Sequence, residues 1–307
     1  MKTLVTGATG FIGSHLCKEL IQKGHTVYGL TRSGKTDKIK SLLNKKEFYL
    51  HKVDIRDEKA LFDIIKDNKI KAIFHLAAQL PQTDDLKNPF LCFDVNARGT
   101  LNLLYAAYLN DVDYFMFGST MSVYSDPPVY LPVDEKHPLQ SSTIYGVSKL
   151  SSEFYCNLYS KFINMVILRF SGVYGLGQSE HNAVLRFINQ ASSNSPITIY
   201  GDGTQTSDYV YIKDVVQAIL FAWGNNKTGT YNIGSGEEIS VKDLAKRIVN
   251  ALNSKSETVM TGKETDRPFR FFFDIKKSRK DLNYSPRCFD EGLSMYLSEF
   301  DIEDSEI

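Results

Sequence analysis

Short apolar runs alternate with amphipathic stretches through roughly the first 170 residues of the chain. The apolar runs predict buried strands at Thr3–Thr6, Thr26–Leu30, Phe48–Val53, Ala72–Leu76, Tyr114–Phe117 and Met165–Phe170. Apolar residues at steps of three and four predict helices between them, at Ile12–Gln22, Lys59–Lys66, Asn96–Leu109 and Thr143–Tyr159. Strands that alternate with helices in this way indicate an α/β fold with a doubly wound parallel sheet.

After about Gly172 the segments become shorter, more polar and richer in glycine. The predicted elements are a helix near Ala183–Ala191, strands at Ile197–Tyr200 and near Tyr209, a helix at Asp214–Trp223, a strand at Thr230–Ile233, and helices at Val241–Leu252 and Phe289–Phe300. We therefore predict a dinucleotide-binding domain over 1–171 that regains a strand and a helix from about 205–225. A smaller α/β cap that binds substrate would cover most of 172–300, and 301–307 would form a frayed acidic tail.

Charge and composition narrow the class of partner. The 36 basic and 36 acidic side chains give no net charge, which argues against nucleic acid or an anionic membrane and favours a small-molecule substrate. No segment has the apolar length of a membrane span, and the first strand begins too early for a signal peptide, so we expect a cytoplasmic protein. The four cysteines and six histidines are scattered, and we expect no metal site.

Three glycines follow the first predicted strand at a spacing of three. Gly7, Gly10 and Gly13 would allow a sharp turn, a close backbone approach to a pyrophosphate, and tight packing of the next helix on the sheet. The anion would lie at the positive end of the helix dipole. The alternative is an ordinary strand-turn-helix corner without a ligand. With its sequence context, the motif favours a Rossmann-type nucleotide site.

A phenol and an ammonium group, on Tyr145 and Lys149, lie four residues apart on a predicted helix. Both would project from one face, where a nearby cation favours the phenolate needed for acid-base chemistry. The same spacing occurs at Tyr209 and Lys213, but on a predicted strand and turn. Before Tyr145, the hydroxyls of Ser119 and Thr120 follow a strand at the carboxyl end of the sheet, where such sheets bind ligands; their alternative role is to form the turn.

These motifs together resemble the extended short-chain dehydrogenases/reductases of the NAD(P)-dependent nucleotide-sugar epimerase/dehydratase family. The resemblance covers nearly the whole chain. It rests on the glycine motif, Val53–Asp57, His75–Ala78, Asn96 with Gly99-Thr100, Ser119-Thr120 before Val123-Tyr124, Tyr145 with Lys149, Leu168–Phe170 before Val173–Gly175, and Tyr200–Gly203.

The resemblance implies the roles of the site residues. Thr120, Tyr145 and Lys149 would be catalytic, and Lys149 would also hold the nicotinamide ribose and lower the pKa of the phenol. Asp54 and Ile55 would flank the adenine, and Asn96 would support the site. The full set implied for cofactor binding is Gly7, Gly10, Phe11, Ile12, Gly13, Thr31, Arg32, Asp54, Ile55, Leu76, Ala77, Ala78, Asn96, Tyr145, Lys149, Phe170 and Ser171.

Departures from the family pattern narrow the reaction. Dehydratases of the family usually follow the catalytic Thr with Asp-Glu, whereas this chain has Met121-Ser122, which argues against dehydration. We predict an oxidoreductase that acts at carbon 4 of a nucleoside-diphosphate sugar, in the first place a 4-ketoreductase. The alternatives are a 4-epimerase similar to UDP-glucose 4-epimerase, a reductase of non-sugar carbonyls, and a non-catalytic NAD(P)-binding sensor or scaffold.

The end of the second predicted strand bears on the cofactor. NAD enzymes typically carry an acidic residue there, but this chain has Thr31 and Arg32. Arg32 could stack on adenine and bind the 2′-phosphate of NADP, a type of hydrogen bond that contributes about 1.5 to 3 kcal/mol. We therefore predict a preference for NADP, with NAD as the alternative if Arg32 is a solvated charge.

The predicted substrate contacts are Met121, Ser122, Gly172, Ser207 and Arg267. Gly172 and Ser207 stand where many family members have Asn and Arg that touch the nucleotide diphosphate. Arg267 or nearby Arg270 could supply the missing cation, or either could be a surface charge. Apolar faces on the Asn96–Leu109 and Thr143–Tyr159 helices, together with the resemblance, predict a homodimer.

Overall fold

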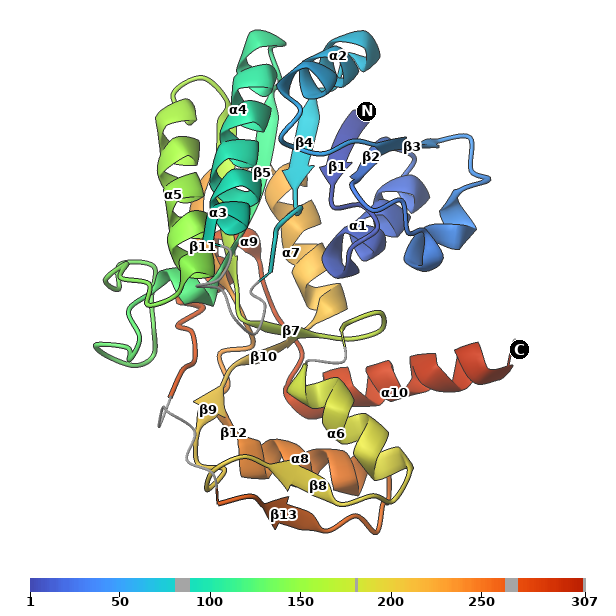
Figure 1. The fold of residues 1–307 in the computed structure, drawn as a ribbon, viewed down its shortest axis with the longest axis vertical. Helices are drawn as coiled ribbons and strands as arrows, with labels where there is room; N and C mark the ends of the chain where they lie inside the picture. The colour runs from blue at the N-terminus through green and yellow to red at the C-terminus, as the bar shows by residue number, and fades with distance from the viewer. Residues whose placement is uncertain (81–88, 180–181, 263–269, 306–307) are drawn as a thin grey trace. The chain divides into compact units, whose positions relative to one another are not determined.

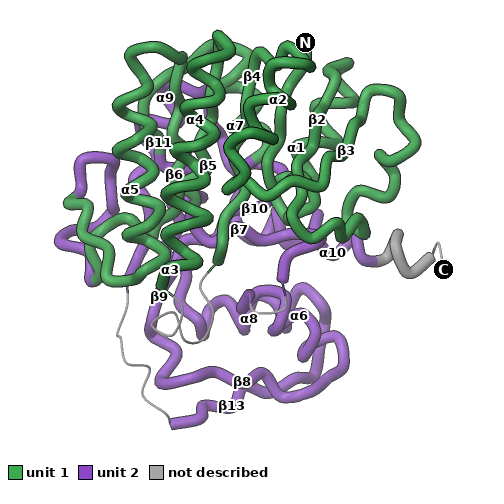
Figure 2. Tube along the Cα trace, turned by 45° about the horizontal axis from the view of Figure 1, so that its top comes forward, with its two compact units in different colours: residues 1–126, 138–170, 216–231 green, residues 127–137, 171–215, 232–307 purple. Residues whose placement is uncertain are grey.

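The computed structural model describes residues 1–80, 89–179, 182–262 and 270–305. The chain divides into two compact units, which Figure 2 distinguishes by colour. Unit 1 comprises residues 1–126, 138–170 and 216–231, and unit 2 comprises 127–137, 171–215 and 232–307. The chain therefore leaves unit 1 after residue 170 and returns to it once. Among the described residues, no helix is both long enough and apolar enough to cross a membrane.

A seven-stranded sheet lies at the centre of unit 1, with the strand order β11-β6-β5-β4-β1-β2-β3. Neighbours among β1 to β6 pair in parallel, and this confirms the predicted Rossmann-type α/β fold. Parallel pairing requires a crossover between strands, which the intervening helices supply. The strands are β1 (Lys2–Thr6), β2 (Thr26–Thr31), β3 (Phe48–Lys52), β4 (Ala72–His75), β5 (Tyr114–Thr120), β6 (Asn164–Phe170) and β11 (Gly229–Ile233).

Helices cover both faces of this sheet (Figure 1). On one face, strand residues such as Leu4, Ile73 and Phe115 are buried together with residues of α2, α4 and α5. On the other, the Phe74 ring meets the Trp223 ring of α7 at 5.2 Å between centroids. The helical segments around this sheet are α1 (Phe11–Gln22), η1 (Asp37–Leu42), α2 (Glu58–Asn68), α3 (Pro89–Cys92), η3 (Phe93–Arg98), α4 (Gly99–Leu109), η4 (Met121–Val123), α5 (Ile144–Tyr159) and α7 (Ile212–Gly224).

Short two-stranded pairings organise unit 2. Strand β10 pairs with β7, β12 with β9, and β13 with β8. The Asp208 carboxylate is fully buried and accepts N–H groups from Ser235, Gly236 and Phe273 at 2.7 to 3.2 Å. The elements are β7 (Gly172–Tyr174), α6 (Ala183–Ser192), β8 (Ile197–Ile199), β9 (Thr206–Ser207), β10 (Tyr209–Tyr211), β12 (Ile239–Ser240), α8 (Val241–Ala251), β13 (Thr258–Met260), α9 (Lys276–Leu282) and α10 (Phe289–Ser305).

Four features differ from the sequence expectation. The strand that returns to the sheet is β11, because the strand near Tyr209 is already paired with β7. Residues 127–137 group with unit 2, where Val133 forms a bridge with Phe273. Helix α10 continues through Ser305, so most of the expected acidic tail is helical. The sequence analysis also missed α9, whose residues are mostly charged and lack an apolar periodicity.

Candidate active site

The turn between β1 and α1 is built from the three glycines. Gly7 has a φ of +68°, and a Cβ there would lie 2.9 Å from the backbone nitrogen of Ala77. Gly10 donates its N–H to the Gly7 carbonyl at 2.8 Å, and Gly13 packs against the same oxygen. Helix α1 starts without a side-chain cap, which leaves its first N–H groups available to a ligand. The turn therefore fits the pyrophosphate of a dinucleotide. The backbone N–H groups of Phe11, Ile12 and Gly13 would donate hydrogen bonds to it.

The loop that follows β4 is held against this turn. In the loop Leu76–Ala78, the backbone N–H groups of Leu76 and Ala77 donate to the Thr6 hydroxyl at 3.2 and 3.0 Å. The buried His75 ring joins Thr6 to Thr100, with its Nδ1 2.6 Å from one hydroxyl and its Nε2 2.9 Å from the other. Burial lowers the pKa of His75 well below its usual range, so the ring is neutral near pH 7. These hydrogen bonds fix the backbone of the loop that carries Ala77 and Ala78.

Asn96 joins the same loop to helix α5. Its amide oxygen accepts the Gln79 N–H at 2.7 Å, and its amide nitrogen donates to the Gln79 carbonyl at 3.0 Å and to the Ser148 hydroxyl at 2.9 Å. The residue is buried in the π-helical turn η3, which the sequence analysis had placed at the start of a regular helix. Asn96 therefore fixes the position of the helix turn between Tyr145 and Lys149.

The end of β2 carries the two residues that bear on cofactor choice. The buried Thr31 hydroxyl lies 2.9 Å from the Thr9 hydroxyl and belongs to the packing of the turn. The Arg32 side chain is exposed, and both of its terminal nitrogens lie 3.5 Å from the Gln79 amide oxygen. Within the described residues, no carboxylate forms an ion pair with Arg32. Its guanidinium is free to bind an anion.

Asp54 and Ile55 follow β3. The Asp54 carboxylate receives a two-pronged hydrogen bond from Arg56, at 3.0 Å from Nε and 2.7 Å from Nη2, and this bond lowers the pKa of Asp54. Ile55 is buried, and a Cβ at Gly99 would lie 2.7 Å from its side chain. Asp54 is thus held as a charged acceptor, while Ile55 packs on the start of α4.

The candidate catalytic hydroxyls meet where β5 ends and α5 begins. Thr143 caps α5 by accepting the Gly146 N–H at 3.0 Å. A Cβ at Gly146 would lie 2.2 Å from the Ser122 carbonyl oxygen, so only glycine lets the first helical turn approach the strand end this closely. The Thr120 side chain acts on the Tyr145 phenol and favours its charged form. The structure therefore brings together two of the three predicted catalytic residues.

Lys149 lies one turn further along α5 and is almost completely buried. Its Nζ lies 4.0 Å from the centroid of the Phe117 ring. Burial lowers the pKa of Lys149 to about 7. Burial also raises the pKa of Tyr145 to about 12, although the Thr120 side chain acts in the opposite direction. In the protein alone the phenol pKa therefore lies above its usual value, whereas the sequence predicts that Lys149 lowers it.

A buried ion pair beneath the site was missed by the sequence analysis. Glu153 of α5 accepts two hydrogen bonds from Arg169 of β6, at 3.0 Å from Nε and 2.6 Å from Nη2. The Ser119 hydroxyl donates to the same carboxylate, and Arg169 donates to the Tyr124 hydroxyl at 2.8 Å. Ser119 is therefore engaged in packing, which leaves Thr120 as the strand-end hydroxyl nearest to Tyr145. The spacing of Glu153, four residues after Lys149, was the available sequence signal.

The other predicted contacts in unit 1 lie near the same strand ends. Met121 and Ser122 form the single turn η4, and the Thr120 hydroxyl lies 3.3 Å from that of Ser122. Phe170 ends β6 and is buried, in van der Waals reach of Gly118. Met121 and Ser122 do not provide the acid and the base that dehydration requires.

The predicted contacts in unit 2 have distinct surroundings. Ser171 donates its hydroxyl to the Asp208 carboxylate at 3.2 Å. A Cβ at Gly172 would lie 3.0 Å from the Asp208 carbonyl and 3.4 Å from the Tyr209 ring, so that ring occupies the space beside it. Ser207 lies in the β9 strand opposite Ile239. Arg267 lies outside the described residues. Arg270 is held by Glu238, at 2.7 Å from Nε and 2.8 Å from Nη2.

Comparison with known proteins decides the family. The sequence pattern of the NAD dependent epimerase/dehydratase family matches residues 3–234. The chain belongs to this family. It is 33% identical to the UDP-glucose 4-epimerase of Mycolicibacterium smegmatis over 310 residues, which cover 98% of both chains. The family assignment confirms that the chain is an enzyme of the short-chain dehydrogenase/reductase type.

Solved structures of family members have the same fold. The UDP-glucose 4-epimerase of Thermotoga maritima, with UDP-glucose, superposes with a TM-score of 0.90 at 28% identity and 99% coverage of both chains. The UDP-glucuronic acid 4-epimerase of Bacillus cereus, with UDP-glucuronic acid and NAD, gives a TM-score of 0.86 at 33% identity, covering 98% of this chain and 100% of that one. These relatives favour the predicted alternative, a 4-epimerase, over the 4-ketoreductase.

Proposed function

We propose that this family member is a UDP-hexose 4-epimerase. The observation that carries the proposal is the Tyr145 phenol, on which Thr120 acts, one helical turn from buried Lys149, in a chain whose full-length relatives include UDP-sugar 4-epimerases. An epimerase needs one group that takes a proton from the sugar hydroxyl and later returns it. A single phenol can do both, and the site has no Asp-Glu pair after Thr120.

The cofactor site fits a nicotinamide dinucleotide. The uncapped start of α1, the Gly7 turn and the Leu76–Ala78 loop form a backbone cradle with little side-chain bulk. When bound, the dinucleotide supplies reversible hydride transfer at carbon 4 of the sugar. Lys149 projects from the same helix face as Tyr145, where its ammonium would hold the nicotinamide ribose. A nearby positive charge would also lower the pKa of Tyr145 from the value that burial imposes.

In this proposal Tyr145 moves the proton and Thr120 orients the substrate. The Tyr145 oxygen takes the proton of the C4 hydroxyl while the C4 hydrogen leaves with its electron pair, which gives a 4-ketone. The same oxygen returns the proton after hydride has come back to the other face of the ketone. Thr120, which acts on the Tyr145 phenol, would hold the C4 oxygen within reach.

The decisive experiment measures interconversion of UDP-glucose and UDP-galactose without added reductant. An epimerase converts one sugar into the other with purified protein that retains its cofactor. A 4-ketoreductase instead consumes NADPH in proportion to the product formed. Stoichiometric NADPH oxidation with a 4-keto sugar nucleotide, and no interconversion, would overturn the proposal.

We also propose a preference for NADP, on the ground of Arg32. Its guanidinium is exposed, lies 3.5 Å from the Gln79 amide oxygen and forms no ion pair within the described residues, so it can receive the 2′-phosphate. The solved relative from Bacillus cereus contains NAD, which makes NAD the alternative. Titration of cofactor-free protein with both dinucleotides tests the preference: Arg32→Asp should weaken NADP binding about tenfold or more and leave NAD binding nearly unchanged. Tighter NAD binding by the unmodified protein would overturn it.

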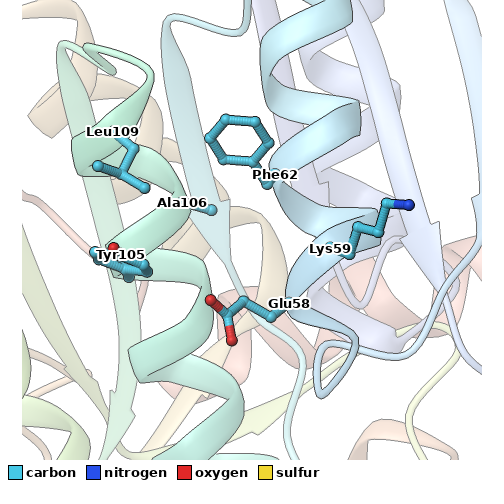
Figure 3. A pocket seen from close by; sticks show the side chains of 6 residues that line it. All are labelled: Glu58, Lys59, Phe62, Tyr105, Ala106 and Leu109. Carbon is cyan, nitrogen blue, oxygen red and sulfur yellow. The ribbon is translucent and has the colours of Figure 1, made fainter.

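We further propose a homodimer that forms through α4 and α5. These neighbouring helices expose large apolar side chains, which are Tyr105, Tyr108, Leu109, Phe154 and Leu158. Next to them lies a pocket of about 290 Å³ whose lining includes Phe62, Tyr105, Leu109 and Glu58. Figure 3 shows these side chains on α2 and α4. Exposed apolar surface of this extent is typical of an interface. Sedimentation equilibrium gives the mass, and a monomer at micromolar concentration would contradict the dimer.

A further inference from the structure

Among the described arginines of unit 2, Arg186 is the one that is partly buried and forms no ion pair. Arg186 is half-buried on α6, and its guanidinium carbon lies 5.3 Å from the centroid of the Phe187 ring and 5.5 Å from that of the Tyr200 ring. Its Nε is buried and has no hydrogen-bond partner. Within the described residues, no carboxylate lies within ion-pair distance of this side chain.

The other arginines of unit 2 behave differently. Arg247 pairs with Glu237 at 2.7 Å, Arg270 with Glu238 at 2.7 Å, and Arg287 with Asp214. Arg279 forms no described ion pair either, but it is exposed and therefore solvated. A cation that is partly withdrawn from water without a partner costs free energy. The aromatic contacts offset part of that cost, and an anion from outside the chain would offset the rest.

The surroundings of Arg186 connect it to the predicted substrate contacts. The Arg186 charge acts on the buried Tyr209 phenol, whose pKa burial raises to about 12 and this charge partly lowers. The Tyr209 ring lies beside Gly172, and Ser207 precedes it by two residues. Arg186 is thus a free cation near the segment that carries Gly172 and Ser207, whereas Arg270 is already neutralised by Glu238.

We propose that Arg186 binds a phosphoryl group of the substrate's diphosphate. The inference rests on the proposed function, because a nucleoside-diphosphate sugar brings the anion. The planar guanidinium presents paired N–H donors that match phosphoryl oxygens, and the Phe187 and Tyr200 rings fix its plane before the substrate arrives. Arg186 then supplies the positive charge that Ser207 lacks.

The test compares the affinities of UDP and uridine by isothermal titration calorimetry. Uridine has the nucleoside but no phosphate, so it isolates the anion. Arg186→Gln should weaken UDP binding about 10- to 100-fold and change uridine binding less than about twofold. Arg186→Lys keeps the positive charge but not the paired N–H donors of the guanidinium, and its affinity for UDP should fall about three- to tenfold. The matched control Arg279→Gln should bind both ligands like the unmodified protein.

Several outcomes would overturn the inference. Unchanged UDP affinity in Arg186→Gln would do so, and so would an equal loss of UDP and uridine, which would indicate a shape effect. If Arg186→Gln lacks a cooperative thermal transition, Arg186→Lys decides, and an unchanged UDP affinity there overturns the assignment. Absence of epimerisation together with Arg186-dependent UDP binding would refute the proposed function alone.

Discussion

Two arginines, one in each unit, have opposite surroundings. Arg169 in unit 1 is buried and satisfied, with Glu153 on two of its nitrogens and Tyr124 on a third. Arg186 in unit 2 is half-buried and rests on aromatic rings with no anion in the described residues. The first charge is neutralised within the fold, and the second is available to a ligand. Arg169 therefore helps to hold α5 in place, whereas Arg186 is the charge that we propose binds substrate.

The same division applies to the polar groups around α5. Asn96 and Glu153 fix this helix from both sides of Lys149 through hydrogen bonds to three other segments. Catalysis requires that Tyr145 and Thr120 stay within about 0.5 Å of a productive geometry, which such a shell provides. Substrate affinity has no such requirement, and a single preset cation suffices.

Tyr145→Phe should abolish proton transfer and leave binding intact. We expect kcat to fall about 10²- to 10⁴-fold, or roughly 3 to 5.5 kcal/mol, because in the proposed mechanism the Tyr145 oxygen takes and returns the proton of the C4 hydroxyl. Steady-state kinetics with UDP-galactose measure this loss, and calorimetry should show UDP affinity within about twofold of the unmodified protein. A kcat within tenfold would show that another group moves the proton.

Arg169→Met should destabilise the fold, because it leaves Glu153 charged and buried without its partner. The expected loss in free energy of unfolding is about 3 to 5 kcal/mol, measured by urea denaturation. The matched control is Arg98→Met, which removes an exposed pair with Asp94 and should cost less than about 1 kcal/mol. Equal effects of the two substitutions would contradict the assigned role of Arg169.

Lys149→Met should inactivate the enzyme but stabilise it near neutral pH, by more than about 1 kcal/mol, because it removes a buried charge. Burial lowers the pKa of Lys149 from 10.5 to about 7, so between these values the unfolded chain binds more protons at this residue. Its contribution to stability therefore rises with pH across that window. Urea denaturation at pH 7 to 9 should show the gap between the two proteins narrowing, and a constant gap would show an unshifted lysine.

Arg186→Met should have the smallest effect on the ligand-free fold. No ion pair is lost within the described residues, so the free energy of unfolding should change by less than about 1 kcal/mol. Urea denaturation of Arg186→Met and Arg169→Met under the same conditions compares their free energies of unfolding. A loss of 3 kcal/mol or more would mean that Arg186 supports the fold, and the contrast between the two arginines would disappear.

Local pattern was sufficient to predict the doubly wound sheet and much of the candidate site. The apolar runs and helical periodicity correspond to β1 to β6 and to α1, α2, α4 and α5, with ends that differ by a few residues. The glycine turn and the Tyr145–Lys149 spacing are short-range features, so their geometry follows from a strand, a turn and a helix. The segments 127–137 and β11 were misassigned, because their partners are far away in sequence.

The chemistry of the chain can be predicted from its sequence alone: a dinucleotide turn, a phenol with a lysine one turn away, and no dehydratase acid-base pair. Which charges are neutralised and which remain free depends on the three-dimensional fold. Arg169 and Arg186 look alike in the sequence, but Arg169 pairs with a carboxylate from another element, and Arg186 pairs with none in the part of the chain that the structure describes. Charge pairing depends on distances between segments, and burial sets the strength of each interaction, so neither can be obtained from local periodicity.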